Sequence, residues 1–440
     1  MEMKPSSQKI NLSGKKIVVV GLGVSGLWTV RCLALNGADV TASEINPETE
    51  LDPVIFRELR ELGVTFETGG HTGDTFLNAD MIVISPGVPH DMVLLCKARK
   101  NGIQVTGELE LASRLIDTPM IAVTGTNGKS TVTTALGHIL KNAGFSVFVG
   151  GNIGTPLIAY AAGEKKADYA VVEVSSFQLD TIETFCPFVS VVLNISPDHL
   201  DRYPSYEDYA QSKLKIFKNQ KPGHYAILND DDERLAVVSP SSGVSVLRYG
   251  FEKKEGRYAY IENREIMVHV DPIKTNRFRF ESYRLPGKHN LENLMAIVLG
   301  AQALNINPSL LQENINGFKG LPNRLEHVRE LNGVTFYNDS KATNVDAAVK
   351  AVLSVRAAEA NVKKAIFLGE AKELLSASFE GTFPLSLAED MGEAVSMAFA
   401  CAKSGDAVLL APACSSFDMF SDYAHRGSVF RAEVERLACG

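Results

Sequence analysis

Residues 122–131 read Ala-Val-Thr-Gly-Thr-Asn-Gly-Lys-Ser-Thr, and this stretch decides the fold around it. An apolar, β-branched run leads into a glycine-rich turn, and a helical pattern follows. Gly125 and Gly128 let successive backbone N–H groups converge on phosphate oxygens, Lys129 reaches the β- and γ-phosphates, and Ser130 can coordinate Mg²⁺. The stretch therefore predicts an α/β domain that binds a nucleoside triphosphate.

Length and composition restrict the class of protein. The 440 residues are long for a single core and predict about three domains. A hydrophobic content of 45% and a charged content of 22% are typical of globular proteins. The formal net charge of -8 argues against nucleic acid as the main partner.

Cysteine usage and apolar runs indicate the compartment. The six cysteines are scattered without a C-x-x-C pair, which favours free thiols in a reducing compartment over disulfides or zinc. The first residues lack the apolar core of a signal peptide, and no uninterrupted apolar run of about 18 residues occurs. We expect a cytoplasmic protein with no membrane span.

Strand and helix patterns alternate along the chain and predict three α/β domains. In residues 1–107 we expect a Rossmann-like domain, with strands at 16–20, 38–42, 64–67 and 81–85 and helices after 23 and at 91–100. In residues 108–320 we expect a central mononucleotide-binding domain, with strands at 121–124, 146–149, 169–174, 189–194 and 225–229 and helices ending at 143 and covering 206–219 and 290–303.

The remaining predictions concern the later part of the chain. Apolar residues alternate with polar ones between 244 and 285, which predicts extra antiparallel strands. Gly320-Leu321-Pro322 predicts a hinge. Residues 321–440 then form a second, smaller Rossmann-like domain, with strands at 335–338, 365–368 and 407–410 and helices at 345–355 and 389–404.

The N-terminal domain carries a dinucleotide-binding pattern. Gly21, Gly23 and Gly26 follow a strand, and Glu44 lies where an acidic residue would bind a ribose. The pattern indicates that a diphosphate binds at the start of the helix. A nicotinamide cofactor is one molecule that could supply this diphosphate. The alternative is a tight turn with a purely structural role. The turn that begins at Ser85 could line the same pocket.

Polar side chains end three strands of the central domain. Glu173, Asn194 and His199 lie at the sheet edge where the phosphate loop (residues 124–131) begins, so a carboxylate and an imidazole there are candidate metal ligands. Solvated or capping side chains are the alternative. Asp198 and Asp201 more plausibly cap the segment that follows.

Four further polar positions have open readings. Lys213 lies beside the apolar face of its helix, and spacing alone makes it an ordinary border lysine. Asn290 and Asn293 share a helix face and can bind adenine or phosphate, or cap the helix. Arg324, near the hinge, has the bidentate, always charged guanidinium that suits phosphate.

Together these stretches resemble the Mur ligase family over nearly the whole chain. The motifs are TGTNGKST at 124–131, GNIG at 151–154, EVSSFQL at 173–179, GKHN at 287–290 and DSKATN at 339–344. The SSFQL stretch and GLGVSG at 21–26 favour the member that adds D-glutamate over its sister ligases.

The resemblance implies an ATP-dependent, ADP-forming amide ligase of peptidoglycan precursor synthesis. ATP would phosphorylate the carboxylate of UDP-N-acetylmuramoyl-L-alanine, and the amine of D-glutamate would attack the acyl phosphate. Mg²⁺ is the implied metal, and these small molecules are the implied partners of a cytoplasmic monomer.

The same resemblance implies roles for individual residues. Catalysis falls to Lys129, Glu173, His199, Lys213 and Lys341. ATP is bound by Gly125, Thr126, Asn127, Gly128, Lys129, Ser130, Thr131, Asn290, Asn293, Arg324 and Asp339. The UDP-sugar is bound by Gly23, Val24, Ser25, Ser43, Glu44, Ser85, Gly87, Asn152, Ser175 and His199. D-glutamate is bound by Lys341, Thr343, Ser416 and Tyr423. The metal ligands are Ser130, Glu173, His199 and Lys213, the last as a carbamate whose oxygen replaces a cation that would repel Mg²⁺.

One departure from the family lies after Gly369. The family continues there with a second glycine and a lysine that serves the amino-acid site, whereas this chain runs into a helical pattern from Glu370 to Leu375. We infer that about one β-α unit of roughly 30 residues is absent. The third domain would be shortened and activity impaired; Lys372 is a candidate replacement without support from spacing.

Three other functions remain open. A nicotinamide-dependent oxidoreductase would use the N-terminal glycine pattern but leaves the phosphate loop without a role. Another Mur-type ligase or a folylpolyglutamate ligase would share the fold and differ in substrate. A binding protein that uses ATP without ligation would be consistent with the shortened third domain.

Overall fold

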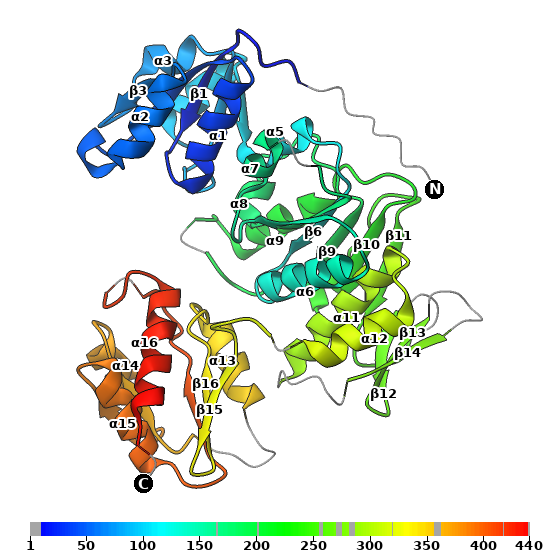
Figure 1. The fold of residues 1–440 in the computed structure, drawn as a ribbon, viewed down its shortest axis with the longest axis vertical. Coiled ribbons are helices and arrows are strands. Elements are labelled where there is room, and N and C mark those ends of the chain that lie inside the picture. The colour runs from blue at the N-terminus through cyan, green and yellow to red at the C-terminus, as the bar shows by residue number, and fades with distance from the viewer. Residues whose placement is uncertain are drawn as a thin grey trace. The chain divides into compact units, whose positions relative to one another are not determined.

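The computed structural model describes residues 10–163, 166–199, 202–254, 258–269, 275–280, 287–318, 320–355, 362–416 and 418–438. The chain divides into two compact units (Figure 1). The first consists of Met1–Ile195, His199–Phe278 and Leu294–Gln312, and the second of Ser196–Asp198, Arg279–Asn293 and Glu313–Gly440. No helix of the described residues is long and apolar enough to cross a membrane.

The first unit begins with a parallel five-stranded sheet in the order β3-β2-β1-β4-β5. Its strands are β1 (Lys16–Val20), β2 (Asp39–Glu44), β3 (Thr65–Thr68), β4 (Met81–Ile84) and β5 (Gln104–Gly107). Its helices are α1 (Val24–Leu35), α2 (Pro53–Glu61), α3 (Gly73–Leu77) and α4 (Val93–Lys100). Strand β4 is buried along its whole length, as its continuous apolar run predicts.

A nine-stranded sheet follows, in the order β14-β13-β12-β11-β10-β9-β6-β8-β7. Its strands are β6 (Met120–Thr124), β7 (Val147–Gly151), β8 (Tyr169–Glu173), β9 (Val189–Val192), β10 (Tyr225–Asn229), β11 (Ser245–Tyr249), β12 (Tyr258–Glu262), β13 (Glu265–His269) and β14 (Thr275–Arg279). The helices of this stretch are α5 (Glu108–Leu115), α6 (Lys129–Asn142), α7 (Leu157–Ala162), α8 (Ser176–Leu179), α9 (Tyr206–Leu214), α10 (Glu233–Ala236), α11 (Lys288–Ala303) and α12 (Pro308–Gly317). Helix α6 covers a face formed by β6, β7 and β8 (Figure 1).

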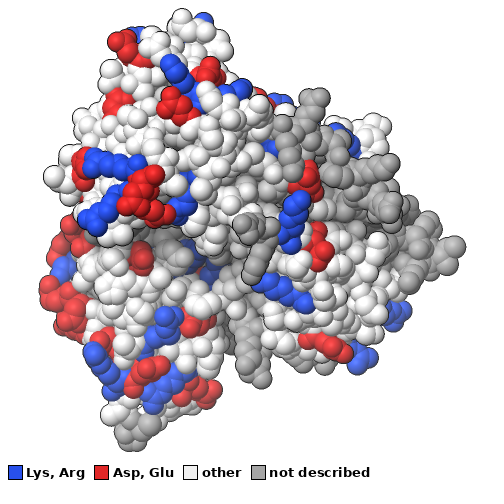
Figure 2. All heavy atoms as spheres, turned by 45° about the horizontal axis from the view of Figure 1, so that its top comes forward, with Lys and Arg blue, Asp and Glu red and all other residues white. Residues whose placement is uncertain are grey.

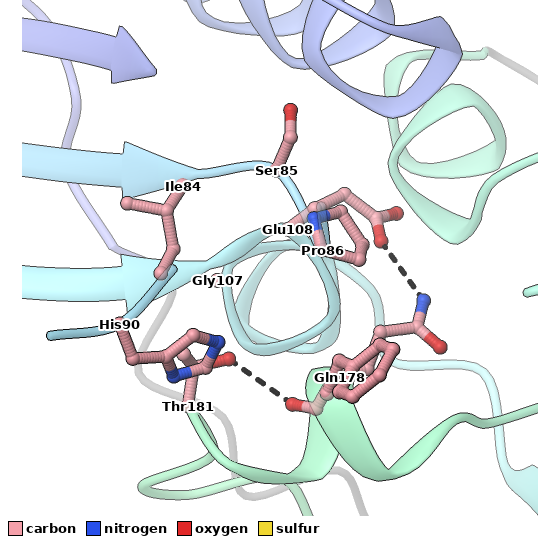
Figure 3. A pocket seen from close by; sticks show the side chains of 9 residues that line it. Ile84, Ser85, Pro86, His90, Gly107, Glu108, Gln178 and Thr181 are labelled. Atoms are coloured by element: carbon pink, nitrogen blue, oxygen red, sulfur yellow. Dashed lines mark hydrogen bonds between the residues drawn. The ribbon is translucent and has the colours of Figure 1, made fainter. Parts of the chain in front are cut away.

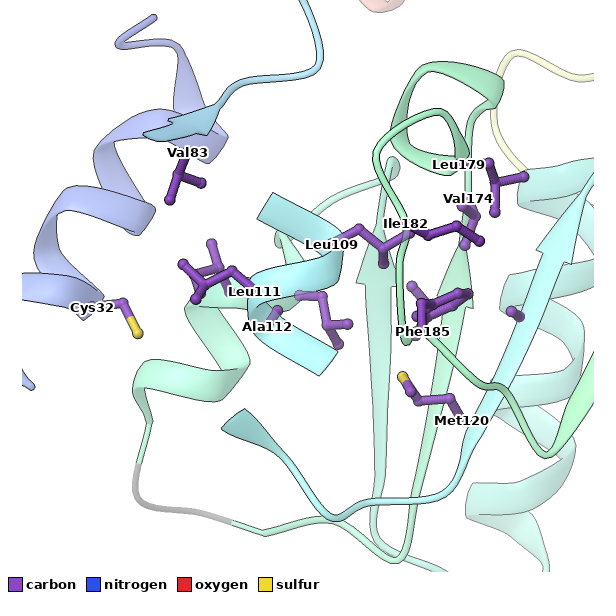
Figure 4. Packing of buried hydrophobic residues seen from close by; sticks show 14 of the residues in the cluster. Cys32, Val83, Leu109, Leu111, Ala112, Met120, Val174, Leu179, Ile182 and Phe185 are labelled. Carbon is purple, nitrogen blue, oxygen red and sulfur yellow. The ribbon is translucent and has the colours of Figure 1, made fainter. Parts of the chain in front are cut away.

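The two sheets of the first unit share one hydrophobic core. Helix α1 packs against α7, and α5 packs against both α7 and β5. The cluster runs from Cys32 on α1 through Leu111 and Ala112 on α5 to Ile182 and Phe185 (Figure 4). Burial raises the pKa of the Cys32 thiol to about 11, with the Glu108 charge as a second cause, so this cysteine is an unreactive core residue.

The second unit contains a sheet in two parts. Strands β15 (Glu326–Leu331), β16 (Val334–Asn338) and β19 (Ala407–Leu410) form one part, and β17 (Ala365–Phe367) and β18 (Leu385–Leu387) form the other. Its helices are α13 (Val345–Ser354), α14 (Lys372–Ser378), α15 (Met391–Cys401) and α16 (Tyr423–Arg436). Helix α14 confirms the helical pattern predicted after Gly369.

Side chains bridge the two parts of this sheet. Lys363, before β17, lies 2.6 Å from the Oδ2 of Asp406, before β19. At the opposite ends, the Glu370 N–H donates to Asp418 Oδ2 at 3.2 Å. Among the described residues β17 and β19 nevertheless share no backbone ladder. This arrangement fits a sheet that lacks one strand between β19 and β17, as the shortened third domain predicts.

The predicted strands lie within two residues of the observed ones at each end, but the extra strands differ in direction. We expected antiparallel pairing between 244 and 285; instead β11 pairs in parallel with β10 and β12 in parallel with β11, and the first antiparallel pair is β12 with β13. Alternation of apolar residues identifies a strand but does not determine the direction of its neighbour. The elements that were not predicted include helix α16 and strands β5, β15 and β18.

Candidate active site

The phosphate loop (residues 124–131) joins β6 to α6. Gly125 and Gly128 have φ angles of +146° and +89°, which L side chains rarely adopt. The Nζ of Lys129 donates to the carbonyl oxygens of Gly125 at 3.0 Å and Thr126 at 2.8 Å. The Lys129 side chain therefore folds back over the carbonyl groups of the loop. Ser130 and Thr131 are buried in the first turn of that helix.

Asn194, after β9, holds this loop in place. Its Oδ1 accepts from the Asn127 N–H at 2.9 Å, and its Nδ2 donates to the Asn127 carbonyl at 3.0 Å. The Thr126 N–H donates to the Asn194 carbonyl at 2.9 Å. The sequence singled out Asn194 as a polar strand end; the structure shows that its side chain orders the loop backbone.

Lys213 on α9 also reaches the phosphate loop. Its Nζ donates to the Gly125 carbonyl at 2.9 Å and lies 4.5 Å from the centre of the Tyr209 ring. The side chain is 2% exposed, so the reading of Lys213 as a border lysine, taken from spacing alone, is wrong. Its burial depends on α9 packing beside the loop, which helical spacing cannot reveal. Two lysines thus converge on the Gly125 carbonyl.

A carboxylate lies on the neighbouring strand. Glu173 ends β8 and is in register with Val123 of β6, immediately before the loop. The residue is 3% exposed, and its Oε1 accepts from Asn152 Nδ2 at 2.8 Å. The Asn152 N–H also donates to the Glu173 carbonyl at 2.9 Å. Asn152, expected at the UDP-sugar, therefore lies beside the candidate metal ligand.

Ser175 begins α8 with a capping box. Its Oγ accepts from the Gln178 N–H at 3.3 Å, and the Gln178 Oε1 accepts from the Ser175 N–H at 3.0 Å. The Gln178 Nε2 lies 3.5 Å from Oε2 of Glu108, the first residue of α5. Burial raises the pKa of Glu108 to about 7, although the Ile158 N–H and Gln178 donate to it.

A small pocket lies at this junction. It is lined by Ser85 and Pro86 from the end of β4, by Glu108, and by Phe177, Gln178 and other residues that Figure 3 shows. Ser85 donates from its Oγ to the Gly21 carbonyl at 2.7 Å. The turn at Ser85 therefore contacts the N-terminal glycine turn on one side and the pocket with Glu108 and Phe177 on the other.

His199 and Arg202 flank the same region. The His199 ring lies 4.9 Å from the Phe177 ring, and its φ of 53° is unusual for a residue with a side chain. The Arg202 guanidinium lies 4.3 Å from the Phe177 ring centre and donates to the carbonyls of Gly87 and Val88 at 3.0 and 2.8 Å. Arg202 was not singled out from the sequence, because only the fold brings it to the turn that follows β4.

The N-terminal glycine turn is closely packed at one glycine and open at another. A Cβ at Gly26 would lie 1.9 Å from the Gly21 carbonyl oxygen, whereas a Cβ at Gly23 would meet nothing within 4 Å. Val24 is 65% exposed at the start of α1, beside Ser25. These features allow close packing at Gly26 and close approach of a ligand at Gly23.

The carboxylate of Glu44, at the end of β2, accepts two backbone hydrogen bonds. Glu44 Oε2 accepts from the Leu22 N–H at 2.6 Å, and Oε1 accepts from the Asn46 N–H at 3.2 Å. Ser43 is buried, with its Oγ 2.8 Å from Nδ1 of His71. In this structure the Glu44 carboxylate orders the glycine turn itself.

The second unit gathers the remaining predicted ATP residues. Asp339 follows β16; burial raises its pKa to about 6, while the Leu325 N–H and the charge of Arg324 oppose the shift. Asn290 and Asn293 are both buried on α11. Asp198, expected to cap the segment after it, accepts from Asn344 Nδ2 at 3.1 Å; Asp201 lies outside the described residues.

The predicted amino-acid residues lie on two loops and one helix of this unit. The Nζ of Lys341 lies 4.7 Å from the centre of the Tyr423 ring. Ser416 is buried in the loop after β19, and Thr343 is exposed. Lys372, the candidate replacement for the absent lysine, pairs with Glu389 at 2.6 Å. In the described part of the chain, the hydrogen bond and ion pair of Lys372 go to Glu389 and not to Lys341 or Ser416.

Charges are interspersed on the face shown in Figure 2, where lysines and arginines alternate with acidic residues among the described parts. The positive groups that matter for the site are individual side chains. Lys129 and Lys213 meet at the phosphate loop, and Lys341, in the loop after β16, lies beside the ring of Tyr423.

Two family profiles match the chain. The Mur ligase middle domain matches residues 123–301, and the Mur ligase MurD-like N-terminal domain matches residues 15–107. A relative in Desulfosudis oleivorans, named UDP-N-acetylmuramoylalanine–D-glutamate ligase, is 42% identical and covers 100% of this chain and 99% of its own length. The chain belongs to the Mur ligase family.

Further comparisons agree with this membership. A protein of the same name in Geotalea daltonii is 40% identical over 98% of this chain and 99% of its own length. A pseudomurein peptide ligase from Methanothermus fervidus has the same fold, with a TM-score of 0.58 and 22% identity over 97% of this chain and 100% of its own. So does the MurF ligase from Thermotoga maritima in complex with ADP, with a TM-score of 0.56 and 17% identity over 98% of this chain and 100% of its own.

The alignment with the Desulfosudis protein also bears on chain length. It spans 459 positions, whereas this chain has 440 residues, so about 19 or more positions of this Mur ligase relative have no counterpart here. A difference of this size is compatible with the loss of a short segment such as the β-α unit inferred to be absent after Gly369.

Proposed function

We propose that this Mur ligase joins D-glutamate to UDP-N-acetylmuramoyl-L-alanine, with cleavage of ATP to ADP and phosphate. The observation that carries the proposal is the convergence of Lys129 and Lys213 on the phosphate loop, with Glu173 on the adjoining strand. The names of relatives about 40% identical over the full length support the choice of substrates. We further propose that the protein acts as a cytoplasmic monomer with three domains, at 1–107, 108–320 and 321–440.

The reaction begins with phosphoryl transfer. A carboxylate oxygen of the alanyl group attacks the γ-phosphorus of ATP, and ADP leaves. Loop N–H groups and Lys129 would neutralise the phosphate charge, with Gly125 to Thr131 surrounding the β- and γ-phosphates. Asn194 accepts from the N–H groups of Thr126 and Asn127 and so holds the loop backbone in one conformation. In the second unit Asn290, Asn293, Arg324 and Asp339 would bind the rest of ATP.

Amide formation follows. The neutral amine of D-glutamate attacks the acyl carbon, the amine loses a proton, and the C–O bond to phosphate breaks. Lys341, Thr343, Ser416 and Tyr423 would bind the amino acid, and a lysine beside an aromatic ring suits a carboxylate-bearing substrate at this position.

The N-terminal domain would bind the UDP-sugar. Gly23, Val24 and Ser25 present the open start of α1 to a diphosphate, because a Cβ at Gly23 meets nothing. Ser43, Glu44, Ser85, Gly87, Asn152, Ser175 and His199 are the other proposed contacts. The engagement of Glu44 with Leu22 favours a role in ordering the turn.

Mg²⁺ fits the residues beside the loop. The Ser130 hydroxyl and the buried Glu173 carboxylate are oxygen donors of the kind Mg²⁺ prefers, and Mg²⁺ usually takes few protein ligands and keeps phosphate and water. Bound there, it would neutralise phosphate charge. His199 and a carbamate on Lys213 would serve a second ion.

Phosphate release tests the function. We expect ATP-dependent release only when UDP-N-acetylmuramoyl-L-alanine and D-glutamate are both present, and Lys129→Ala to lower the rate on the order of 10²–10³-fold. Lys141→Ala, on the exposed end of the same helix, is the matched control. Turnover with a folate instead, or reduction of a nicotinamide cofactor, would contradict the proposal. An ordinary catalytic rate would refute impairment by the shortened third domain.

The carbamate has its own test. Wild-type protein equilibrated with ¹³C-bicarbonate should show a carbamate carbon resonance that Lys213→Ala removes and Lys215→Ala keeps. Absence of the resonance in active wild-type enzyme would leave Lys213 as an ammonium that binds phosphate directly and would overturn the carbamate proposal.

A further inference from the structure

Arg426 lies inside the second unit, four residues into the α16 sequence, and is 5% exposed. Its Nε donates to Ser340 Oγ at 3.0 Å and its Nη2 to the Ser340 carbonyl at 2.8 Å. On the other side, Nη1 donates to the Ser415 carbonyl at 2.9 Å and Nη2 to the Cys414 carbonyl at 3.2 Å. One guanidinium therefore joins the loop after β16 to the loop after β19.

These two loops carry the proposed amino-acid residues. Lys341 follows Ser340 directly, and Ser416 follows Ser415 directly. The Ser340 Oγ also donates to the carbonyl of Tyr423, the first residue of α16, at 2.8 Å. Within the described residues, the hydrogen bonds of Arg426 go to Ser340 and to backbone carbonyls. A displacement of Arg426 would nevertheless move Lys341, Ser416 and Tyr423, because they adjoin or contact the residues that it holds.

The charge of Arg426 has no acidic partner in its hydrogen bonds. The described contacts of its guanidinium are three carbonyl oxygens and one hydroxyl oxygen. Burial lowers its pKa from the ordinary value, yet an arginine stays protonated in proteins. In the described part of the molecule, the Asp418 carboxylate acts on this cation through its charge and not through a hydrogen bond. Because these hydrogen bonds of the guanidinium are all made to neutral oxygens, its charge adds to that of Lys341 and favours a ligand that carries more than one negative charge.

The backbone around this cation is closely packed. A Cβ at Gly427, the next residue of α16, would lie 1.9 Å from Asn323 Oδ1. The Gly427 carbonyl accepts from Asn338 Nδ2 at 3.3 Å, and Asn338 ends β16. Helix α16 is therefore fixed against the strand from which the first loop begins, so the guanidinium has a defined position.

We propose that Arg426 is a positioning residue of the amino-acid site: it sets the distance between the Lys341 and Ser416 loops and makes the site selective for a dicarboxylic amino acid. This inference rests on the proposed function. A lysine at this position keeps the charge but cannot reach both loops with one planar group, and a methionine loses both properties.

Steady-state kinetics of Arg426→Lys and Arg426→Met test the inference. We expect Arg426→Lys to raise KM for D-glutamate about 10–100-fold, the effect of losing one or two charge-assisted hydrogen bonds, with KM for ATP and the UDP-sugar within about twofold. Arg426→Met should also lower the ratio of kcat/KM for D-glutamate to kcat/KM for D-glutamine. Should Arg426→Met fail to fold by circular dichroism, Arg426→Lys still decides the matter.

The matched control is Arg329→Lys. Arg329 of β15 donates to the carbonyls of Val434, Glu435 and Leu437 at the far end of α16, so its loss also removes bonds to carbonyls. It should leave KM for D-glutamate unchanged. Two results would overturn this inference but not the proposed function. One is an equal rise in KM for D-glutamate in Arg329→Lys and Arg426→Lys, and the other is an unchanged KM for D-glutamate in Arg426→Lys. Wild-type protein that neither turns over D-glutamate nor binds it in calorimetry would overturn the proposed function as well.

Discussion

Single polar residues with little exposure account for much of the candidate site. Each meets a backbone group or a second polar side chain only in the fold. They are the buried Lys213, Glu173 and Glu108 and the half-buried Asn194. Because an unpaired buried polar group is costly, these contacts fix the side chains in one geometry. The residue scale is therefore where a substitution has the most specific effect.

Glu108 should make stability depend on pH. Its pKa in the fold is about 7, above the ordinary value of 4.5, because burial disfavours the charged form. Between about pH 4.5 and 7 the unfolded chain releases this proton while the fold retains it, so stability falls as pH rises, by up to about 3 kcal/mol. Chemical denaturation across this range should show a smaller slope for Glu108→Gln than for the wild type.

Glu110, on the same helix, is the control for this prediction. Burial raises its pKa, but hydrogen bonds from Thr184 and from the N–H groups of Glu183 and Phe185 lower it overall. The charged Glu110 carboxylate therefore adds to the stability of the fold above its ordinary pKa, and this stabilisation is lost as the pH falls. Glu110→Gln should leave the slope between about pH 4.5 and 7 as in the wild type. An unchanged slope in Glu108→Gln would contradict the assignment.

Substitution of Asn194 should weaken the binding of ATP and not that of the other substrates. Asn194→Ala removes two hydrogen bonds to Asn127, and we expect KM for ATP to rise about tenfold, equivalent to roughly 1–1.5 kcal/mol. Asn142→Ala, at the exposed end of α6, serves as the control in the same phosphate-release assay. An ATP KM equal to that of the control would show that the loop keeps its conformation without Asn194.

At the scale of elements, the third domain differs most from a regular α/β layer. Strands β17 and β18 have three residues each and are only partly buried, whereas β16 is paired on both sides. Helix α13 exposes Val345, Val349 and Leu353, at 69%, 50% and 56%, four residues apart along one face. Successive right-handed crossovers in one direction place helices on the same face of a sheet, so we attribute this bare face to the absent β-α unit.

Hydrogen exchange should reveal the divided sheet. We expect the amides of β17 and β18 to exchange through local opening, because two short strands form little ladder and bury little apolar surface. Amides of β16 should exchange only with unfolding of the unit. Hydrogen-exchange mass spectrometry, with the folded protein labelled at neutral pH, would distinguish amides that exchange through local opening from amides that exchange only on unfolding. Equal protection in β16 and β17 would show that the sheet behaves as one element despite the missing ladder.

At the scale of the molecule, the core of the first unit joins two sheets that the sequence assigns to two domains. Leu111 on α5 is 1% exposed and lies in the cluster that contains Cys32 of α1 and Phe185 of the central domain (Figure 4). Shared core residues couple the unfolding of the elements that they join. The first unit should therefore unfold cooperatively, apart from the second.

Calorimetry of Leu111→Ala tests this coupling. The cavity should destabilise the first unit by about 2–5 kcal/mol and shift the transition of both its sheets together. Leu331→Ala, in the separate core of the second unit, is the matched control and should shift the other transition. Separate transitions for the two sheets of the first unit in Leu111→Ala would show that the shared core does not couple them.

Local sequence was sufficient for the phosphate loop, for most of the parallel strands of the first unit and for the family motifs. Gly125, Gly128 and Lys129 are contiguous, so one stretch of chain contains the whole pattern and its strand and helix. The direction of β11 and β12, the burial of Lys213 and the role of Arg426 could not be predicted in this way. Helix α16 was missed, although Asp422 caps it and Val429, Phe430 and Val434 have helical spacing.

The physical reason is the range of the interactions. A glycine-rich turn and a strand are determined by φ and ψ preferences and by side chains a few residues apart, which the sequence by itself contains. The contact of Lys213 with Gly125 and those of Arg426 with Ser340 and Ser415 join residues 88, 86 and 11 positions apart. Only the tertiary structure decides these contacts, because packing of separate elements removes the side chains from water and brings them to the loops.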